Sequence, residues 1–294
     1  MPEEDTLEEN VTSLRGLRVV ALESRMSDQT SVLIERSGGI CIKAPSLREI
    51  PLENNETAFE FAEKLNQAQY DIVIFLTGVG CKLLSQAIET RIPAETWLKS
   101  LSQTVVVARG PKPLVVLRGW GVTVDIQIPE PNTWRDIVEA LDKNCPVEGK
   151  SIAIQEYGQS NLELIEAFIL RGAKSVQSVP VYRWALPEDL EPLRIAIVQM
   201  IEGRIGALVV TSAQQIRHLF QVAEQHQLSQ DLLKVLNEKV IVASVGPIAT
   251  ETLVEYGIVP DIEPVHPKLG PLIQSLAREW PQTKKKPGHE AFGN

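Results

Sequence analysis

Tyr182 carries a phenol that can both donate and accept a hydrogen bond, which makes it a candidate for contact with a ligand. It lies in the stretch Ser178-Val-Pro-Val-Tyr-Arg-Trp184, where the valines favour an extended strand and Pro180 removes a backbone donor. Such a strand fits a sheet edge or a bridge between two bodies, and Tyr182 faces a ligand if the bridge floors a cleft. Packing in the core is the more frequent role of such a tyrosine, and it stays open as the alternative.

Five turns that open predicted helices are rich in small residues. In open parallel sheets, ligands bind beyond the carboxyl ends of the strands, where helix N-termini present unpaired N–H groups and a partial positive charge. One such turn is weak evidence, because every strand–helix unit needs a tight turn, but five indicate a site for a large ligand with several carboxylates or phosphates. The turns are Thr77-Gly-Val-Gly80, Arg109-Gly-Pro-Lys112, Glu156-Tyr-Gly-Gln-Ser160, Thr211-Ser-Ala213 and Gly246-Pro-Ile248.

The motifs of common cofactor and catalytic sites are absent from the sequence. Thr77-Gly-Val-Gly-Cys-Lys82 lacks the third glycine of a dinucleotide fingerprint, and there is no phosphate-binding Gly-Lys-Ser/Thr and no Gly-x-Ser-x-Gly nucleophile turn. The cysteines and histidines show no metal-ligand spacing, so we expect neither a metal nor a cofactor. They are Cys41, Cys81, Cys145, His218, His226, His266 and His289.

Composition sets broad limits on partners and location. The chain has 294 residues, 44% of them hydrophobic and 23% charged, with a formal net charge of −9. A negative chain is unsuited to nucleic acid or to an anionic membrane surface, because both need a basic footprint. The acidic N-terminus is unlike a signal peptide, and no apolar run approaches the roughly 18 residues that span a bilayer. We therefore expect a soluble, cytoplasmic protein.

The elements that must position these residues alternate along the chain. Continuous apolar runs such as Tyr70–Leu76 predict parallel strands covered on both faces, and helices follow them, which indicates an α/β fold. Landmarks recur 133 to 136 positions apart, among them Gly16 with Gly149, Pro45 with Pro180, and Thr77 with Thr211. The repeat predicts two similar lobes, and the two extended crossings near Pro45 and Pro180 predict a two-stranded bridge between them.

The order and spacing of the short blocks resemble those of the uroporphyrinogen-III synthase family. The match extends over about residues 15–280, and the blocks that carry it are Thr77-Gly-Val-Gly80, Ala108-Arg-Gly-Pro-Lys112, Pro180-Val-Tyr-Arg183, Val210-Thr-Ser212, Val245-Gly-Pro247 and Leu269-Gly-Pro-Leu-Ile273. The resemblance implies two Rossmann-like lobes with a cleft between them, the first lobe being discontinuous. The limits it implies are 15–45 with 184–281 for the first lobe and 50–178 for the second, which leaves 46–49 and 179–183 for the bridge. The acidic composition of 1–14, and the lysines Lys284–Lys286 with Gly and Pro in 282–294, predict disordered, solvated ends.

The resemblance also implies a reaction. The family closes the linear tetrapyrrole hydroxymethylbilane with loss of water and inversion of the terminal ring, a lyase reaction of haem biosynthesis without a cofactor. Tyr182 maps onto the tyrosine proposed to protonate the departing hydroxyl. The partners that the resemblance implies for the protein are hydroxymethylbilane and, transiently, the preceding enzyme of the pathway. The implied oligomeric state is a monomer. The implied substrate-binding residues are Arg25, Thr77, Gly78, Val79, Gly80, Arg109, Gly110, Lys112, Tyr157, Gly158, Thr211, Ser212, Ala213, Gly246, Pro247, Ile248 and Thr250.

Two turns depart from the family pattern. Pro113 and Ala249 stand where relatives often carry Ser or Thr, and Thr250 comes one position late, so hydroxyl contacts are in doubt there while the backbone donors are expected to survive. Two other functions stay open on the residues. One is a tetrapyrrole- or anion-binding sensor without turnover. The other is an unrelated two-lobed sugar or nucleotide enzyme, which the missing phosphate motifs disfavour.

Overall fold

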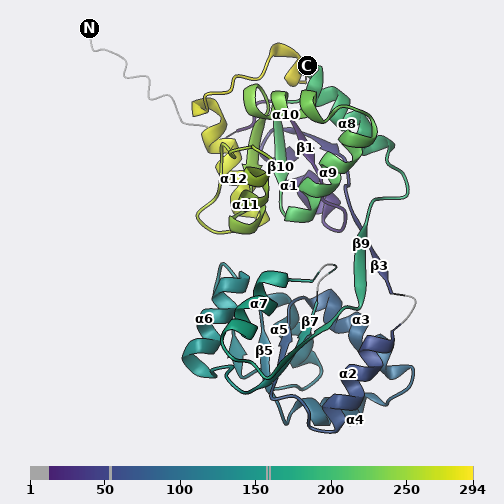
Figure 1. Cartoon of the computed structure of the whole chain (residues 1–294). Coiled ribbons are helices and arrows are strands. Elements are labelled where there is room, and N and C mark those ends of the chain that lie inside the picture. Colours follow the sequence, from purple (N-terminus) through teal and green to yellow (C-terminus); the bar gives the residue numbers. More distant parts are fainter. Residues whose placement is uncertain (1–12, 53–54, 157, 159, 294) are drawn as a thin grey trace. The chain divides into compact units, whose positions relative to one another are not determined.

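A computed structural model describes residues 13–52, 55–156, 158 and 160–293 of the chain. The chain divides into two compact units, the first made of Met1–Arg48 with Leu186–Asn294 and the second of Glu49–Ala185. Each unit holds a parallel β-sheet with helices on both faces (Figure 1). The predicted α/β class with two parallel sheets is therefore confirmed.

The first unit is built on a four-stranded sheet. Its elements are β1 (Arg18–Ala21), α1 (Ser27–Arg36), β2 (Ile40–Lys43), α8 (Glu191–Ile201), β10 (Ala207–Val210), α9 (Ala213–Gln225), α10 (Ser229–Glu238), β11 (Ile241–Ser244), α11 (Pro247–Glu255) and α12 (Leu269–Glu279). The strand order is β11-β10-β1-β2. On one face Val20 and Leu208 pack in a cluster with residues of α8 to α11, and on the other Val19 and Val209 pack with residues of α1 and α12. Alternate residues of a strand point to opposite faces, so both faces of these short apolar strands are buried.

The second unit is built on a five-stranded sheet. Its elements are α2 (Glu56–Asn66), β4 (Ile72–Phe75), α3 (Gly78–Glu89), α4 (Ala94–Leu101), β5 (Val105–Ala108), α5 (Pro111–Gly119), β6 (Ile126–Gln127), α6 (Trp134–Asn144), β7 (Ser151–Gln155), α7 (Leu162–Leu170) and β8 (Ser175–Val179). The strand order is β6-β5-β4-β7-β8. Val73 and Phe75 pack with residues of α2 to α5, whereas Ile72, Ile74 and Ile152 pack with residues of α6 and α7 on the opposite face.

A third, two-stranded sheet joins β3 (Arg48–Pro51) to β9 (Tyr182–Ala185). A two-stranded bridge is expected at 46–49 and 179–183, and the paired strands begin and end two to three residues later, where the chain crosses from one unit to the other. Pro180 falls between β8 and β9 rather than inside one continuous strand. Proline offers no N–H to a ladder, so the extended run ends at Val179 and a new pairing begins at Tyr182.

The strand register fixes how the two units correspond. Ile72 pairs with Ile152 in the second unit, and Ala207 pairs with Val19 in the first. With β7 equivalent to β1 through Gly149 and Gly16, the residue equivalent to Thr77 is Ser212, and each is the N-cap of the following helix. The sequence comparison of Thr77 with Thr211 is therefore wrong by one position, because two Val-rich strands can be aligned in either register.

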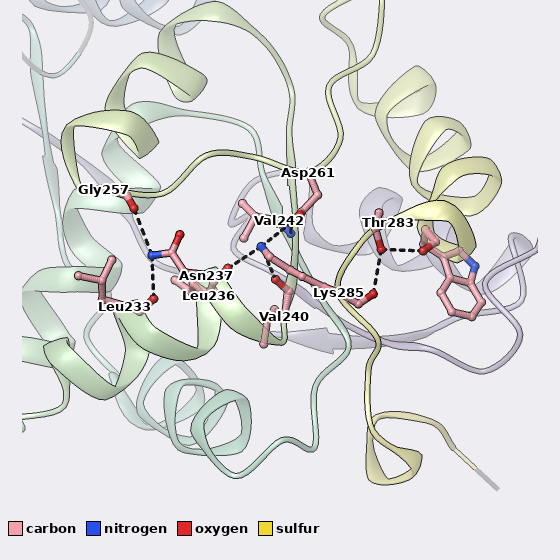
Figure 2. Close-up of polar contacts among 10 residues, drawn as sticks. Leu233, Leu236, Asn237, Val240, Val242, Gly257, Asp261, Thr283 and Lys285 are labelled. Carbon is pink, nitrogen blue, oxygen red and sulfur yellow. Dashed lines mark hydrogen bonds and ion pairs between the residues drawn. The ribbon is translucent and has the colours of Figure 1, made fainter.

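The C-terminal segment is not the predicted solvated tail. Two short 3₁₀ helices, Trp280–Gln282 and His289–Ala291, lie in it, and Phe292 forms a β-bridge with Leu17. Figure 2 shows the buried Lys285, whose Nζ donates to the Leu236 and Val240 carbonyls at 2.6 and 3.1 Å and to Asp261 Oδ2 at 2.6 Å. Three successive lysines, Lys284 to Lys286, predict a solvent-exposed segment. Lys285 is nevertheless buried, because a carboxylate and two carbonyls compensate its charge.

The predicted disordered arm at 1–14 is too long at its C-terminal end. Leu14 is fully buried in the first unit, in the same cluster as Leu17 and Val19, and its N–H donates to the Ser37 carbonyl at 2.7 Å. Residues 1–12 and 294 lie outside the described residues. Within the part of the chain that is described, none of the helices has the length and apolar character needed to cross a bilayer.

Candidate functional site

The turn after β4 is stabilised from two sides. Thr77 is the N-cap of α3, and its Oγ1 accepts the Gly80 N–H at 2.9 Å. The Thr77 N–H donates to Oε1 of the buried Gln155 at 3.2 Å. Two of the predicted donors of this turn therefore have protein partners. Helix geometry leaves the N–H groups of Gly78 and Val79 without intrahelical acceptors, and these are the donors that α3 can offer to an anion.

The glycines of this turn have packing roles of their own. A Cβ at Gly80 would lie 1.9 Å from Gln155 Nε2, and one at Gly78 would lie 2.8 Å from the Lys112 carbonyl oxygen. Gly78 thus permits α3 and α5 to approach closely. Glycines in such a turn permit close approach of a ligand, and here close approach of neighbouring protein atoms accounts for them as well.

The N-terminus of α5 offers fewer donors than we predicted. Gly110 is its N-cap, and both Pro111 and Pro113 lack an N–H, which leaves Lys112 as the donor among the first three residues of the helix. In α11, Pro247 likewise removes one donor and leaves Ile248 and Ala249. The expectation that the backbone donors survive at these two turns is therefore wrong in part. Half-buried Arg109 and exposed Lys112 supply positive charge beside α5.

The turn after β10 keeps its helix terminus open. The Thr211 hydroxyl donates to Glu23, and its N–H donates to Gln215 Oε1 at 2.8 Å, so Thr211 is occupied within the first unit. Ser212 is the N-cap of α9 and makes no capping bond with its side chain. Its buried Oγ has no hydrogen-bond partner in the described part of the chain. Ser212 and Ala213 therefore lie at a helix terminus whose first N–H groups lack intrahelical acceptors, and the Ser212 hydroxyl is buried beside it.

Two further predicted binding residues of the first unit, Gly246 and Thr250, also have structural roles. Gly246 has φ 155°, and a Cβ there would lie 2.8 Å from Cβ of Pro267, so glycine is required by the fold. The Thr250 hydroxyl donates to Ser244 Oγ at 2.9 Å and contacts the Glu263 carboxylate. Arg25 lies exposed just before α1.

Tyr182 begins β9 and is enclosed by protein. Its side chain is 2% exposed and packs in the apolar cluster of the second unit that also holds Val179 and Val181. This placement is the core packing that the sequence analysis kept as the alternative to a catalytic role. Two residues on, the Trp184 ring lies against Gly158, whose φ of 70° and missing Cβ are both required there, since a Cβ would lie 2.5 Å from the ring. Tyr157 lies outside the described residues.

Glu156 is a candidate functional residue that sequence reasoning did not single out. It directly follows β7, is 1% exposed, and accepts the Asn161 N–H at Oε2 over 3.2 Å. Burial raises the pKa of this carboxyl to about 7, against the opposing effects of the Asn161 N–H, the Ser178 hydroxyl and the Arg109 charge. A glutamate directly after a fully buried strand can indicate a functional carboxyl. In the sequence analysis, Glu156 counts only as the first residue of a turn.

Within each unit, these features suit an anionic ligand more than a metal. Open helix N-termini at α3 and α9 and the cations near α5 favour carboxylates. Among the described residues, no group of three or more His, Cys, Asp or Glu side chains is placed to hold a metal ion. The buried carboxyl of Glu156 stands apart, because it repels anions when charged and can exchange a proton near neutral pH.

Comparisons with known proteins agree on one family. The family model of uroporphyrinogen-III synthase HemD matches residues 28–274. The uncharacterized protein YjjA of Bacillus subtilis strain 168 is 28% identical over 91% of this chain and 97% of its own length. A Methanothermobacter thermautotrophicus protein, provisionally named a uroporphyrinogen-III synthase, is 30% identical over 77% of this chain and 84% of its own. Two crystal structures of uroporphyrinogen III synthase from the extremely thermophilic bacterium Thermus thermophilus share the fold, with TM-scores of 0.70 and 0.53 at 22% and 24% identity; each comparison covers 90% of this chain, and 99% and 98% of the respective crystal chains.

Proposed function

Because the chain belongs to the uroporphyrinogen-III synthase family, we propose that it closes hydroxymethylbilane to uroporphyrinogen III. The observation that carries this proposal is the family match over residues 28–274, which includes parts of both units and all five predicted turns. The proposed reaction expels the terminal hydroxyl as water and inverts the last pyrrole ring. It is neutral in redox terms and consumes no second substrate.

The proposed substrate is a polycarboxylate, and the described donors match that chemistry. Within the second unit, the carboxylate contacts that we assign are the open N-terminus of α3, the Lys112 N–H of α5, and the positive side chains Arg109 and Lys112. Within the first unit, the contact that we assign is the open N-terminus of α9. Binding through several fixed donors also restrains the flexible bilane, so that the terminal ring is presented for inversion rather than for direct closure. Arg25 is a further proposed contact.

The resemblance gives Tyr182 the role of acid, and its side chain is a member of the buried apolar cluster of the second unit. We propose that Tyr182 supports the bridge and the second unit, and that its contribution to the reaction is through positioning. The packing in the cluster with Val179 and Val181 supports this assignment, because a general acid must come within hydrogen-bond reach of the group it protonates.

Incubation with freshly generated hydroxymethylbilane tests the proposed function. Spontaneous closure gives the symmetric isomer I, so formation of isomer III above the enzyme-free control supports ring inversion by this chain. Binding of uroporphyrinogen without formation of isomer III would instead support the sensor that keeps the fold and has no turnover.

A further inference from the structure

Three polar side chains of increasing exposure lie near the ends of β7 and β8 in the second unit. Glu156 is buried, Ser178 on β8 is half-buried, and Ser160 before α7 is exposed. The Ser178 and Ser160 hydroxyl oxygens lie 3.3 Å apart, with either able to donate. A serine hydroxyl both donates and accepts, so two in series can pass a proton.

Strand geometry places Glu156 and Ser178 on the same face of the sheet. Ile152 and Ile154 of β7 pack with residues of α6 and α7. Alternate residues of an extended chain point to the same face, so Glu156 lies on the face of Ile152 and Ile154. Ser178 pairs with Ile154 across the β7–β8 ladder. Ser178 therefore lies on the face of the sheet that Glu156 continues, and its hydroxyl is among the groups that lower the pKa of the Glu156 carboxyl.

One of the two carboxyl oxygens of Glu156 has no hydrogen-bond partner in the described part of the chain. Oε2 accepts the Asn161 N–H, whereas Oε1 is buried and has no hydrogen-bond partner among the residues that the structure describes. The one charged group there that shifts the pKa of this carboxyl is Arg109, at the end of β5; α7 contributes the neutral Asn161 N–H and β8 the neutral Ser178 hydroxyl. Desolvation exceeds these three stabilising effects, so the carboxyl exchanges its proton near neutral pH.

We propose that Glu156, Ser178 and Ser160 form a proton relay for the ring-closing reaction, with Ser160 at its exposed end. This inference rests on the proposed function and names residues that carry its proton chemistry. It also supplies a titratable group in the unit where Tyr182 is enclosed by the core.

The relay balances the reaction without any external acid. In the first step the Glu156 carboxylic acid gives its proton through the two hydroxyls to the leaving hydroxyl. The C–O bond then breaks, its electron pair stays on oxygen, and water departs. In the last step the pyrrole carbon that forms the closing bond loses its hydrogen as a proton, the C–H pair returns to the ring, and the proton passes back to Glu156. Each turnover leaves the carboxyl protonated again.

Rates of isomer III formation between about pH 5.5 and 8.5 test the relay in the full-length protein, with enzyme-free closure subtracted at each pH. The acid form of Glu156 starts the cycle, so kcat of the wild type should fall as pH rises above about 7. We expect Glu156→Gln to lower kcat roughly 100-fold and to abolish this fall, since the amide cannot titrate. Ser178→Ala should also lower kcat, and the double variant should be no slower than Glu156→Gln alone. Glu163→Gln, the same change at an exposed site in the first turn of α7, should behave as the wild type.

Three results would overturn the relay. A Glu156→Gln variant with wild-type rate and pH profile would do so, as would a slow variant that keeps the fall above neutral pH, which indicates a structural role. If that variant does not fold, Ser178→Ala decides, because it deletes one hydroxyl, and an unchanged rate and profile would exclude the pathway. A wild-type chain that forms only isomer I would instead overturn the proposed function itself.

Discussion

Single residues at the strand ends divide the tasks of binding and proton transfer between different side chains. The donors that we propose for carboxylates are backbone N–H groups and the Ser212 hydroxyl, whereas the titratable group that we propose for proton transfer is Glu156. The turns could be predicted from sequence because small residues after apolar strands mark them. Which backbone N–H groups already have a protein partner could not be predicted from sequence. The partners of the Thr77 and Thr211 N–H groups are glutamines on β7 and α9, and the directions of these side chains follow from the fold.

Tyr182→Phe tests whether the phenol acts in the reaction. The hydroxyl is buried, so its loss should lower the free energy of unfolding by about 1 kcal/mol, and isomer III formation should fall only a few-fold. Urea unfolding together with the isomer assay gives both numbers. A loss of rate of about 100-fold or more at unchanged stability would return the acid role to Tyr182, as the family resemblance implied.

Ser212→Ala tests the open terminus of α9. The Ser212 Oγ has no partner in the described structure, so its removal should change stability little. If the hydroxyl binds a substrate carboxylate, Kd for uroporphyrinogen should rise about fivefold, which corresponds to about 1 kcal/mol for one hydrogen bond. Titration calorimetry measures this, with Ser229→Ala at the start of α10 as the matched control. Equal affinities of the two variants would remove Ser212 from the site.

Strands and helices were the most predictable part of this fold. Apolar runs and helix periodicity identify most of them, since burial on both faces of a parallel sheet imposes the pattern. Two departures come from interactions that a pattern does not encode. The segment around Lys285 is ordered by distant carbonyls and Asp261, and the break between β8 and β9 comes from the missing N–H of Pro180.

Gly80→Ala tests the packing of α3 against the end of β7. The new Cβ would lie 1.9 Å from Gln155 Nε2, so the amide must move and release the Thr77 N–H. We expect a loss of about 1–3 kcal/mol in the free energy of unfolding. Gly119→Ala is the control in α5, where a Cβ meets nothing within 4 Å and alanine should be neutral or stabilising. Similar losses for both variants would contradict the packing account.

At the scale of the whole molecule, the two ends of the chain belong to one unit. The first unit draws strands from residues 18–43 and 207–244, and the segment that ends at Phe292 pairs with Leu17 beside them. A repeat in the sequence predicts two similar lobes but does not tell a discontinuous unit from two consecutive halves. The resemblance to a known family supplied that distinction, and the division of the chain at Arg48 and Ala185 agrees with it.

Lys285→Met tests how the C-terminal segment contributes to the first unit. The substitution keeps the apolar stem and leaves Asp261 without its cation, so the free energy of unfolding should fall by roughly 3 kcal/mol. Lys286→Met, next in the chain and less buried, should change it by less than about 0.5 kcal/mol. Removal of residues 283–294 should destabilise at least as much as Lys285→Met. A truncated chain with wild-type thermal stability would contradict the structural role of this segment.

The most direct test of the central claim is the isomer composition formed from hydroxymethylbilane by the full-length protein. Product is oxidised to porphyrin and separated by chromatography, with heat-denatured protein as the control for spontaneous closure. The proposed function predicts that isomer III predominates and that its share rises with protein concentration until isomer I is a minor product. Isomer I at the control rate, at every protein concentration, would contradict it.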